Sequence, residues 1–154
     1  LAIDRVPAKA EAARAFGATD ALRGAPEEIV QAVRARTDGR GADYVFEAVG
    51  SAKVLGQAYA ATRRGGTTVT IGLPDPGQRL DLQAVSFVAE ERTLLGSYMG
   101  SAVPQRDISR LLDLYLAGRL PVDELVSRQV ELPSVNAAFD ALREGAVVRQ
   151  LLCF

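Results

Sequence analysis

The sequence predicts an α/β protein built on an open parallel sheet. Residues 42–50, Ala-Asp-Tyr-Val-Phe-Glu-Ala-Val-Gly, are apolar in the middle and rich in β-branched and aromatic side chains, which is typical of a strand covered on both faces. Gly50 ends this run, and Ser51 is a candidate N-cap for the helical pattern that follows. Strand-like and helix-like segments also alternate up to about residue 98. Because ligands of such sheets bind outside the carboxyl ends of the strands, we expect the functional residues there.

The composition excludes several classes of protein and site. A length of 154 residues suits one domain, or one domain with part of another. Hydrophobic residues make up 48% of the chain and the net charge is −1, so the chain can form a core and offers no overall basic charge for nucleic acid or an anionic membrane. No run of 18 apolar residues suggests a membrane-spanning helix. With no His and one Cys, these residues supply neither a zinc site of nitrogen and sulfur ligands nor a Ser-His-Asp or Cys-His catalytic group.

The segment before residue 42 is expected to contain two helices and two short strands. Pro7 suits the first turn of the first helix and Gly17 its C-terminal cap. Ile29, Val30 and Val33 share one face of the second helix. In chain order the expected segments are the tail of a strand at 1–4, a helix at 7–16, a short strand at 18–22, a turn at 24–26, a helix at 27–36 and a turn at 38–41.

After residue 50 the alternation continues and then stops. Gly65 and Gly66 are expected to end a helix, and the β-branched run that follows predicts a strand. In chain order the expected segments are a helix at 52–63, a strand at 67–73, a loop at 74–78, an ambiguous stretch at 80–88, a strand at 93–99, a helix at 107–117, a helical turn at 121–126, a strand at 128–132, a helix at 133–143 and a strand at 147–154. Because the segments beyond Tyr98 are mostly helical, we expect one domain at 1–98 and another at 99–154.

Two charged residues near the first strand are candidates for cofactor binding. In dinucleotide-binding folds, an acid at the end of the second strand accepts hydrogen bonds from the adenosine ribose and repels the 2′-phosphate of NADP. Asp4 occupies such a position, and the alternative is an aspartate that caps the following helix. Lys9, one turn into that helix, could reach the same ribose, and the alternative is a solvated surface lysine.

Other candidates lie at later strand ends. Gly50 and Gly72 would let the backbone approach a ligand closely, or they simply serve the turns. Arg149 stands in an apolar run and needs a partner, either a cofactor phosphate or a structural carboxylate. Glu47 interrupts an apolar strand, and hydrogen bonding to a helix end explains it better than catalysis. Cys153 is expected to be a small buried side chain in the last strand.

The ordered set of short motifs resembles the C-terminal part of the zinc-type alcohol dehydrogenases, in the medium-chain dehydrogenase/reductase superfamily. No single piece is specific, but the set covers nearly the whole chain at matching spacing. The motifs are Ile3-Asp4 with Lys9, Phe16-Gly17-Ala18-Thr19, residues 41–50, Gly65-Gly66, Ile71-Gly72-Leu73-Pro74, Gly96-Ser97-Tyr98-Met99-Gly100, residues 136–142, Gly145 and Arg149.

The resemblance implies a fold and a set of contact residues. The fold would be α/β, a doubly wound parallel (Rossmann) sheet that lacks its first strand, followed by a C-terminal α+β segment of a GroES-like catalytic domain. The implied NAD contacts are Asp4 and Lys9 for the adenosine ribose, Val49 and Gly50 for the adenosine half, Ile71, Gly72 and Leu73 for the nicotinamide, Ser97 and Met99 for its carboxamide, and Arg149 for the pyrophosphate.

The resemblance also implies an activity. This chain would be the cofactor-binding portion of an NAD-dependent, zinc-dependent alcohol dehydrogenase, and alone it is not expected to be catalytic. The zinc ligands, the proton relay and the phosphate-binding loop would all lie upstream of Leu1. The implied substrate is a small alcohol or aldehyde, and the enzyme would be a cytoplasmic homodimer or homotetramer without a nucleic-acid or membrane partner. The alternatives are an NADPH-dependent quinone or enoyl reductase of the same superfamily, which Asp4 argues against, and a non-catalytic nucleotide-binding regulatory domain.

Overall fold

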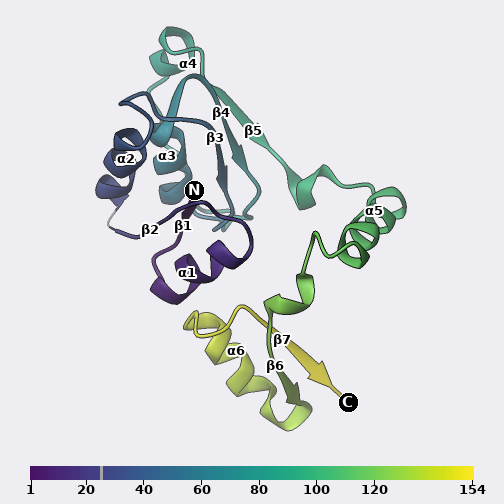
Figure 1. Ribbon diagram of the computed structural model, residues 1–154. Helices are drawn as coiled ribbons and strands as arrows, with labels where there is room; N and C mark the ends of the chain where they lie inside the picture. The colour runs from purple at the N-terminus through teal and green to yellow at the C-terminus, as the bar shows by residue number, and fades with distance from the viewer. Residues whose placement is uncertain (25) are drawn as a thin grey trace. The chain divides into compact units, whose positions relative to one another are not determined.

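A computed structural model describes residues 1–24 and 26–154 of the chain, in two compact units (Figure 1). We call Leu22–Ala102 the central unit. Leu1–Ala21 together with Val103–Phe154 form the terminal unit. The turn expected at 24–26 lies partly outside the described residues, at residue 25.

The central unit contains a three-stranded parallel sheet. Its strands are β3 (Ala42–Glu47), β4 (Thr62–Thr70) and β5 (Thr93–Gly96), and they lie in the order β3-β4-β5. Both strand pairs are parallel, with Val45 opposite Thr68 and Val69 opposite Leu95. Helix α3 (Ala52–Ala61) connects β3 to β4, and α4 (Val85–Ala89) precedes β5. Parallel strands joined through helices confirm the predicted α/β class.

The core of the central unit lies between helices. Leu22, Ile29 and Val33 form a buried cluster with Ala61, so α2 (Pro26–Ala35) packs on α3 through an i, i+4 pair of apolar side chains. Small residues of α3 let the two helices approach closely. On the same helix Tyr59 is buried, and its hydroxyl lies 2.8 Å from Ser86 Oγ, with which it forms a hydrogen bond.

Strand β3 pairs with β4 alone among the described residues. Its Tyr44 and Phe46 side chains alternate with Val45 and are largely exposed. Within the part of the chain that the structure describes, no strand pairs with the other edge of β3. The edge and one face of β3 are therefore open, and they carry aromatic side chains.

The boundary between α3 and β4 differs from the prediction. The helix ends at Ala61, and residues 62–66 belong to the strand rather than to a helix end and a turn. Thr62 adopts extended backbone angles, φ −74° and ψ 137°. A bulge accommodates the glycines, since Ala42 is opposite Thr62 but Tyr44 is opposite Thr67. A Cβ on Gly66 would lie 3.0 Å from the Asp43 carbonyl oxygen, so only glycine fits at that point of the ladder.

The terminal unit contains two small sheets and three longer helices. Strand β1 (Ala2–Ile3) pairs with β2 (Ala21–Leu22), and α1 (Pro7–Ala15) lies between them in the chain. Helix α5 (Pro104–Leu116) begins the C-terminal part. Strands β6 (Val126–Glu131) and β7 (Arg149–Cys153) form a parallel pair, and α6 (Val135–Arg143) connects them. The segment predicted as α+β is thus a parallel β-α-β unit.

The short segments also refine the predictions. Strand β5 ends at Gly96 instead of residue 99, because Tyr98–Ser101 form the 3₁₀ turn η1. The other 3₁₀ turns are η2 (Val122–Leu125) and η3 (Leu132–Ser134). Within the described ranges, no helix has the length and apolar character needed to cross a membrane.

Two buried threonines give a test of the junction between α3 and β4. Thr62 Oγ1 donates to the Ala58 carbonyl oxygen at 2.8 Å and lies 2.7 Å from Thr68 Oγ1, so the Thr68 hydroxyl donates to Thr62. Both threonines are almost completely buried. Thr62→Val would leave the Thr68 hydroxyl without an acceptor, at a cost of about 1–3 kcal/mol, whereas Thr68→Val would lose about 1 kcal/mol. Urea unfolding of the complete protein measures both, with exposed Thr93→Val as the control. Equal losses at the two positions would contradict this direction of donation.

Candidate functional site

The carboxyl ends of β3 and β4 meet at a buried carboxylate. Glu47 is 2% exposed. Its Oε1 accepts hydrogen bonds from the N–H groups of Val49 at 2.8 Å, Gly50 at 2.7 Å and Ser51 at 3.4 Å. Its Oε2 accepts one from the Thr70 hydroxyl at 3.0 Å. One side chain thus binds the turn before α3 to the end of β4, which confirms hydrogen bonding at a helix end as the reason for Glu47.

The sequence identified the N-cap position but not the group that caps the helix. Ser51 is the N-cap residue of α3, yet its side chain makes no capping hydrogen bond. The N–H of Ala52, the first helical residue, donates instead to Gln78 Oε1 at 2.8 Å, and the N–H groups of the preceding turn donate to the Glu47 carboxylate. Thr70, its partner on β4, was not predicted as part of the site, because a β-branched residue in a strand gives no sequence signal for such a bond.

Two glycines bring the strand ends into backbone contact. The Glu47 carbonyl oxygen accepts from the N–H groups of Ile71 at 2.8 Å and Gly72 at 3.1 Å. A Cβ on Gly72 would lie 2.7 Å from Gly50 Cα, and a Cβ on Gly50 would lie 2.6 Å from the Leu73 carbonyl oxygen. Gly50 also has φ +77°. Both glycines therefore have a packing reason that does not depend on a ligand.

Apolar side chains surround this contact on the solvent side. Val49, Ile71 and Leu73 are all exposed at the strand ends, beside Gly50 and Gly72. The structure therefore brings together the five predicted contact residues of this region. An exposed apolar rim over closely packed backbone is typical of a ligand-binding surface.

Ser97 and Met99 lie at the end of the neighbouring strand. The Ser97 N–H donates to the Thr70 carbonyl oxygen at 2.9 Å, which fixes the end of β5 beside that of β4. The Ser97 hydroxyl lies 3.1 Å from that of Ser101, with which it forms a hydrogen bond. Met99 has φ +48°, an uncommon angle for a residue with a side chain, and it is exposed.

In the terminal unit, Asp4 has one oxygen bonded and one available. Its Oδ1 accepts the Val6 N–H at 2.8 Å, so the aspartate does form the turn that precedes α1. Its Oδ2 accepts no hydrogen bond from the residues that the structure describes. Lys9 is half-buried on α1, and its Nζ would lie 3.6 Å from a Cβ on Gly145. The turn role of Asp4 and a role in binding are therefore compatible.

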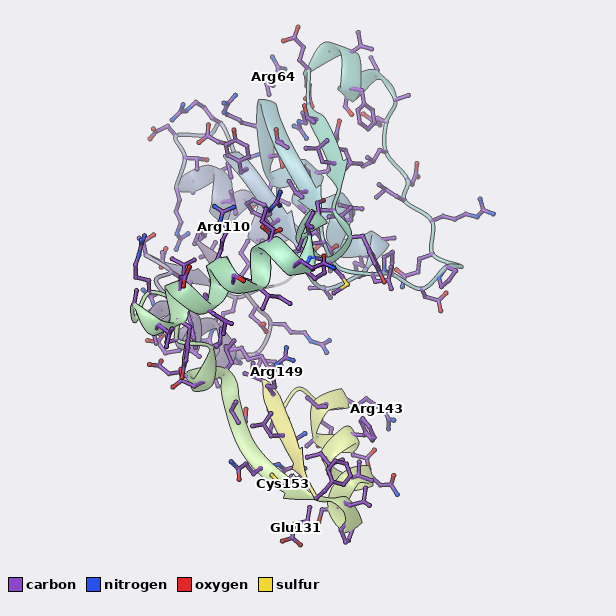
Figure 2. All side chains as sticks on the ribbon, turned by 90° about the vertical axis from the view of Figure 1, so that its right-hand side faces the viewer. Arg64, Arg110, Glu131, Arg143, Arg149 and Cys153 are labelled. Atoms are coloured by element: carbon purple, nitrogen blue, oxygen red, sulfur yellow. The ribbon has the colours of Figure 1, made fainter. Side chains whose placement is uncertain are left out.

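Arg149 is the first residue of β7, opposite Val126 (Figure 2). Its side chain is exposed and makes no hydrogen bond or ion pair with the described part of the chain. A structural carboxylate was the alternative partner expected for Arg149, and the described residues supply none. Cys153, at the other end of β7, is exposed, so the prediction of a buried side chain is wrong. The reason is that every second side chain of β7 is exposed to solvent, and Cys153 is one of them.

The described residues do not provide a metal site. Within 1–24 and 26–154, no three His, Cys, Asp or Glu side chains gather closely enough to hold a metal ion. The described residues therefore offer no set of ligands for zinc. The features that can hold a ligand are the apolar rim, the glycine backbone, Asp4 and Arg149.

Comparisons with known proteins show which proteins the chain is similar to. A family model described as zinc-binding dehydrogenase matches residues 1–117. Alcohol dehydrogenase class-3 of Myxine glutinosa is 36% identical over 155 residues, and the match covers 99% of this chain and 41% of that protein. The putative alcohol dehydrogenase D of Mycobacterium tuberculosis is 38% identical, with 99% and 42% covered.

The fold of the chain is also similar to that of a solved alcohol dehydrogenase structure. The crystal structure of benzyl alcohol dehydrogenase from Acinetobacter calcoaceticus superposes with a TM-score of 0.89 at 27% identity. The match covers 97% of this chain and 41% of that one. The chain thus spans about two-fifths of the length of the relatives it matches.

The contact between Gly50 and Gly72 can be tested by adding a methyl group. Gly72→Ala would force the two strand ends apart and should lower the free energy of unfolding by about 1–3 kcal/mol. Gly56→Ala is the matched control, because its Cβ would meet only Leu80 Cδ1 at 3.9 Å within a helix. That variant should be neutral or stabilising by up to about 1 kcal/mol. Denaturant unfolding of the complete protein checks both, and a tolerated Gly72→Ala would refute the backbone contact.

Proposed function

Because the chain belongs to the zinc-binding dehydrogenase family, we propose that it is the cofactor-binding portion of an NAD-dependent, zinc-dependent alcohol dehydrogenase. The observation that carries the proposal is the apolar rim around Gly50 and Gly72 at the carboxyl ends of parallel strands. The chain spans about two-fifths of its relatives, so the activity belongs to the complete protein. We further propose the domain division at Tyr98, with 1–98 in the cofactor-binding domain and 99–154 in the catalytic domain.

The proposed cofactor contacts divide by the part of NAD they would meet. Asp4 would hold the adenosine ribose through Oδ2, with Lys9 beside it. The rim and its glycines would contact the adenosine and nicotinamide halves. The full proposed set is Asp4, Lys9, Val49, Gly50, Ile71, Gly72, Leu73, Ser97, Met99 and Arg149. The last of these supplies an unpaired guanidinium, which suits the pyrophosphate.

These residues would bind and orient the cofactor and exclude water from it. When bound, NAD supplies the acceptor for the hydride that leaves the alcohol carbon, and the product is an aldehyde or ketone. The backbone N–H groups of Ile71 and Gly72 are held by the Glu47 carbonyl oxygen, so this segment would fix the position of the nicotinamide ring. The described residues of this chain contain no metal site, so zinc would be held by residues outside it.

The assembly and location are also proposals. Strand β5 pairs with β4 alone among the described residues, and an open edge of this kind tends to be paired or covered. We propose a cytoplasmic homodimer or homotetramer in which this edge pairs with a second copy. The quinone or enoyl reductase and the regulatory domain are less well supported, because the relatives described above are named as alcohol dehydrogenases.

The complete protein, loaded with zinc, tests the proposed function. It should oxidise simple alcohols with NAD, followed by the absorbance of the reduced cofactor, and should lose this activity when zinc is removed by a chelator. Binding of NAD is measured separately by calorimetry. A protein that binds NAD but oxidises no alcohol would favour the regulatory domain, and one that prefers NADPH and quinones would favour the reductase.

Asp4 gives a sharper test of cofactor choice. Asp4→Asn keeps an oxygen that can accept the Val6 N–H and removes the negative charge that would repel a 2′-phosphate. We expect the wild type to have a higher kcat/KM with NAD than with NADP. In the variant the ratio of these two values should fall about tenfold. Glu11→Gln, which removes an exposed charge on the helix that follows Asp4, is the control and should leave the preference unchanged. A wild type with the higher kcat/KM for NADP would rule out this role of Asp4.

A further inference from the structure

A second site lies at the opposite end of the central sheet from the glycine contact. A cavity of about 540 Å³ opens where the parallel strands β3, β4 and β5 begin. Its lining includes five arginines, Arg34, Arg40, Arg63, Arg64 and Arg92. The acidic residues of the lining are Asp43 and Glu90. The cavity is open to solvent and its lining is mainly charged, so a ligand there would be held by charge rather than by apolar contact.

The two carboxylates neutralise only part of this charge. Arg63 Nε donates to Asp43 Oδ1 at 2.5 Å, and this bond holds the pKa of Asp43 below its usual range. Arg92 Nε lies 2.9 Å from Glu90 Oε2. Two of the five guanidinium groups face these carboxylates, and Arg40 faces Asp38, so Arg34 and Arg64 have no carboxylate partner among the described residues.

The three remaining arginines have few partners. Arg34 donates to the Ala60 carbonyl oxygen at 3.3 Å, a long bond to a neutral group. Arg40 lies 3.8 Å from the exposed carboxylate of Asp38. Arg64 makes no side-chain hydrogen bond or ion pair with the residues that the structure describes, and Figure 2 shows it at the end of the sheet where the strands begin. A guanidinium has five N–H donors, so most donors of these side chains are unused.

The fold holds part of this cluster rigidly. The Arg92 side chain is 7% exposed and lies over the Tyr59 ring, 5.0 Å from its centroid, while one of its terminal nitrogens donates to the Tyr59 carbonyl oxygen at 2.6 Å. Arg92 Nε is buried and makes no well-formed hydrogen bond, despite its closeness to Glu90. The bulge at the start of β4 places Arg63 and Arg64 outside the regular ladder. Arg92 thus anchors the cluster through Tyr59 and Glu90, and the exposed arginines are the ones that a ligand can reach.

We propose that this cavity binds a small molecule that carries two or more phosphate groups. Planar guanidinium groups bind phosphate through paired hydrogen bonds, and the guanidinium groups of Arg34 and Arg64 have no carboxylate partner among the described residues. The cluster is confined to one cavity of a chain with a net charge of −1, which disfavours an extended nucleic acid as the ligand. The site is separate from the strand ends that would receive NAD, so both ligands can be bound at once.

Calorimetry on the complete protein, with inorganic pyrophosphate as the probe, tests the proposal. We expect one pyrophosphate per chain at low salt, bound more tightly than orthophosphate, with binding retained when NAD is saturating. The double variant Arg40→Ala/Arg64→Ala should weaken binding at least about tenfold, because both side chains are exposed and would each lose charged contacts. Circular dichroism checks that this variant is folded. Arg110→Ala, at an exposed arginine of α5, is the control and should have no effect.

Each other result counts against the proposal. Binding that is lost with NAD or with Arg149→Ala, but kept by the double variant, would assign the pyrophosphate to the cofactor site. Equal binding of orthophosphate and pyrophosphate would show that the site does not recognise two phosphates. Tighter binding of a short RNA than of pyrophosphate, sensitive to the same double variant, would show that the cluster is a nucleic-acid surface. No binding by the wild type would overturn the site altogether.

Discussion

The central unit depends on one buried carboxylate. Glu47 accepts from N–H groups of the turn before α3 and from the hydroxyl of Thr70, while its own carbonyl oxygen accepts from Ile71 and Gly72. A buried charge is costly unless it is fully hydrogen-bonded, and here side chain and backbone of one residue serve two chain segments. The helix start and the strand end are therefore held in one fixed relation. That relation leaves no room for side chains at Gly50 and Gly72, and it sets the outline of the apolar rim.

Much of the fold could be predicted from local signals. Pro7, Gly17 and the spacing of Ile29 and Val33 marked helices correctly, because these signals act through backbone angles and one helix face. The start of β4 could not be predicted, since Arg-Arg-Gly-Gly is typical of a helix end. In the structure the ladder with β3 and the buried bond of Thr62 decide the conformation there. Interactions between distant segments override local preference in such places.

The candidate site was only partly predictable for the same reason. Gly50 and Gly72 stood out as glycines at strand ends, but their contact with each other joins two segments that the sequence cannot place together. Arg149 stood out as a charge in an apolar run, and only the structure shows that its neighbours supply no carboxylate. The arginine cavity gave no signal at all, because its residues come from three separated stretches of chain. The sheet consequently has an apolar end rich in glycine and a cationic end. The cationic end could not be predicted from the sequence.

The open edge of β3 has a consequence for the order of folding. Strands β3 and β4 are joined through α3 alone, so this pair is local in the chain and can form early. Tyr44 and Phe46 then stay exposed beside an unpaired strand until another segment covers them. During that interval the edge is a template for contact with other chains. We therefore expect the yield of correctly folded protein to depend on how quickly this edge is covered.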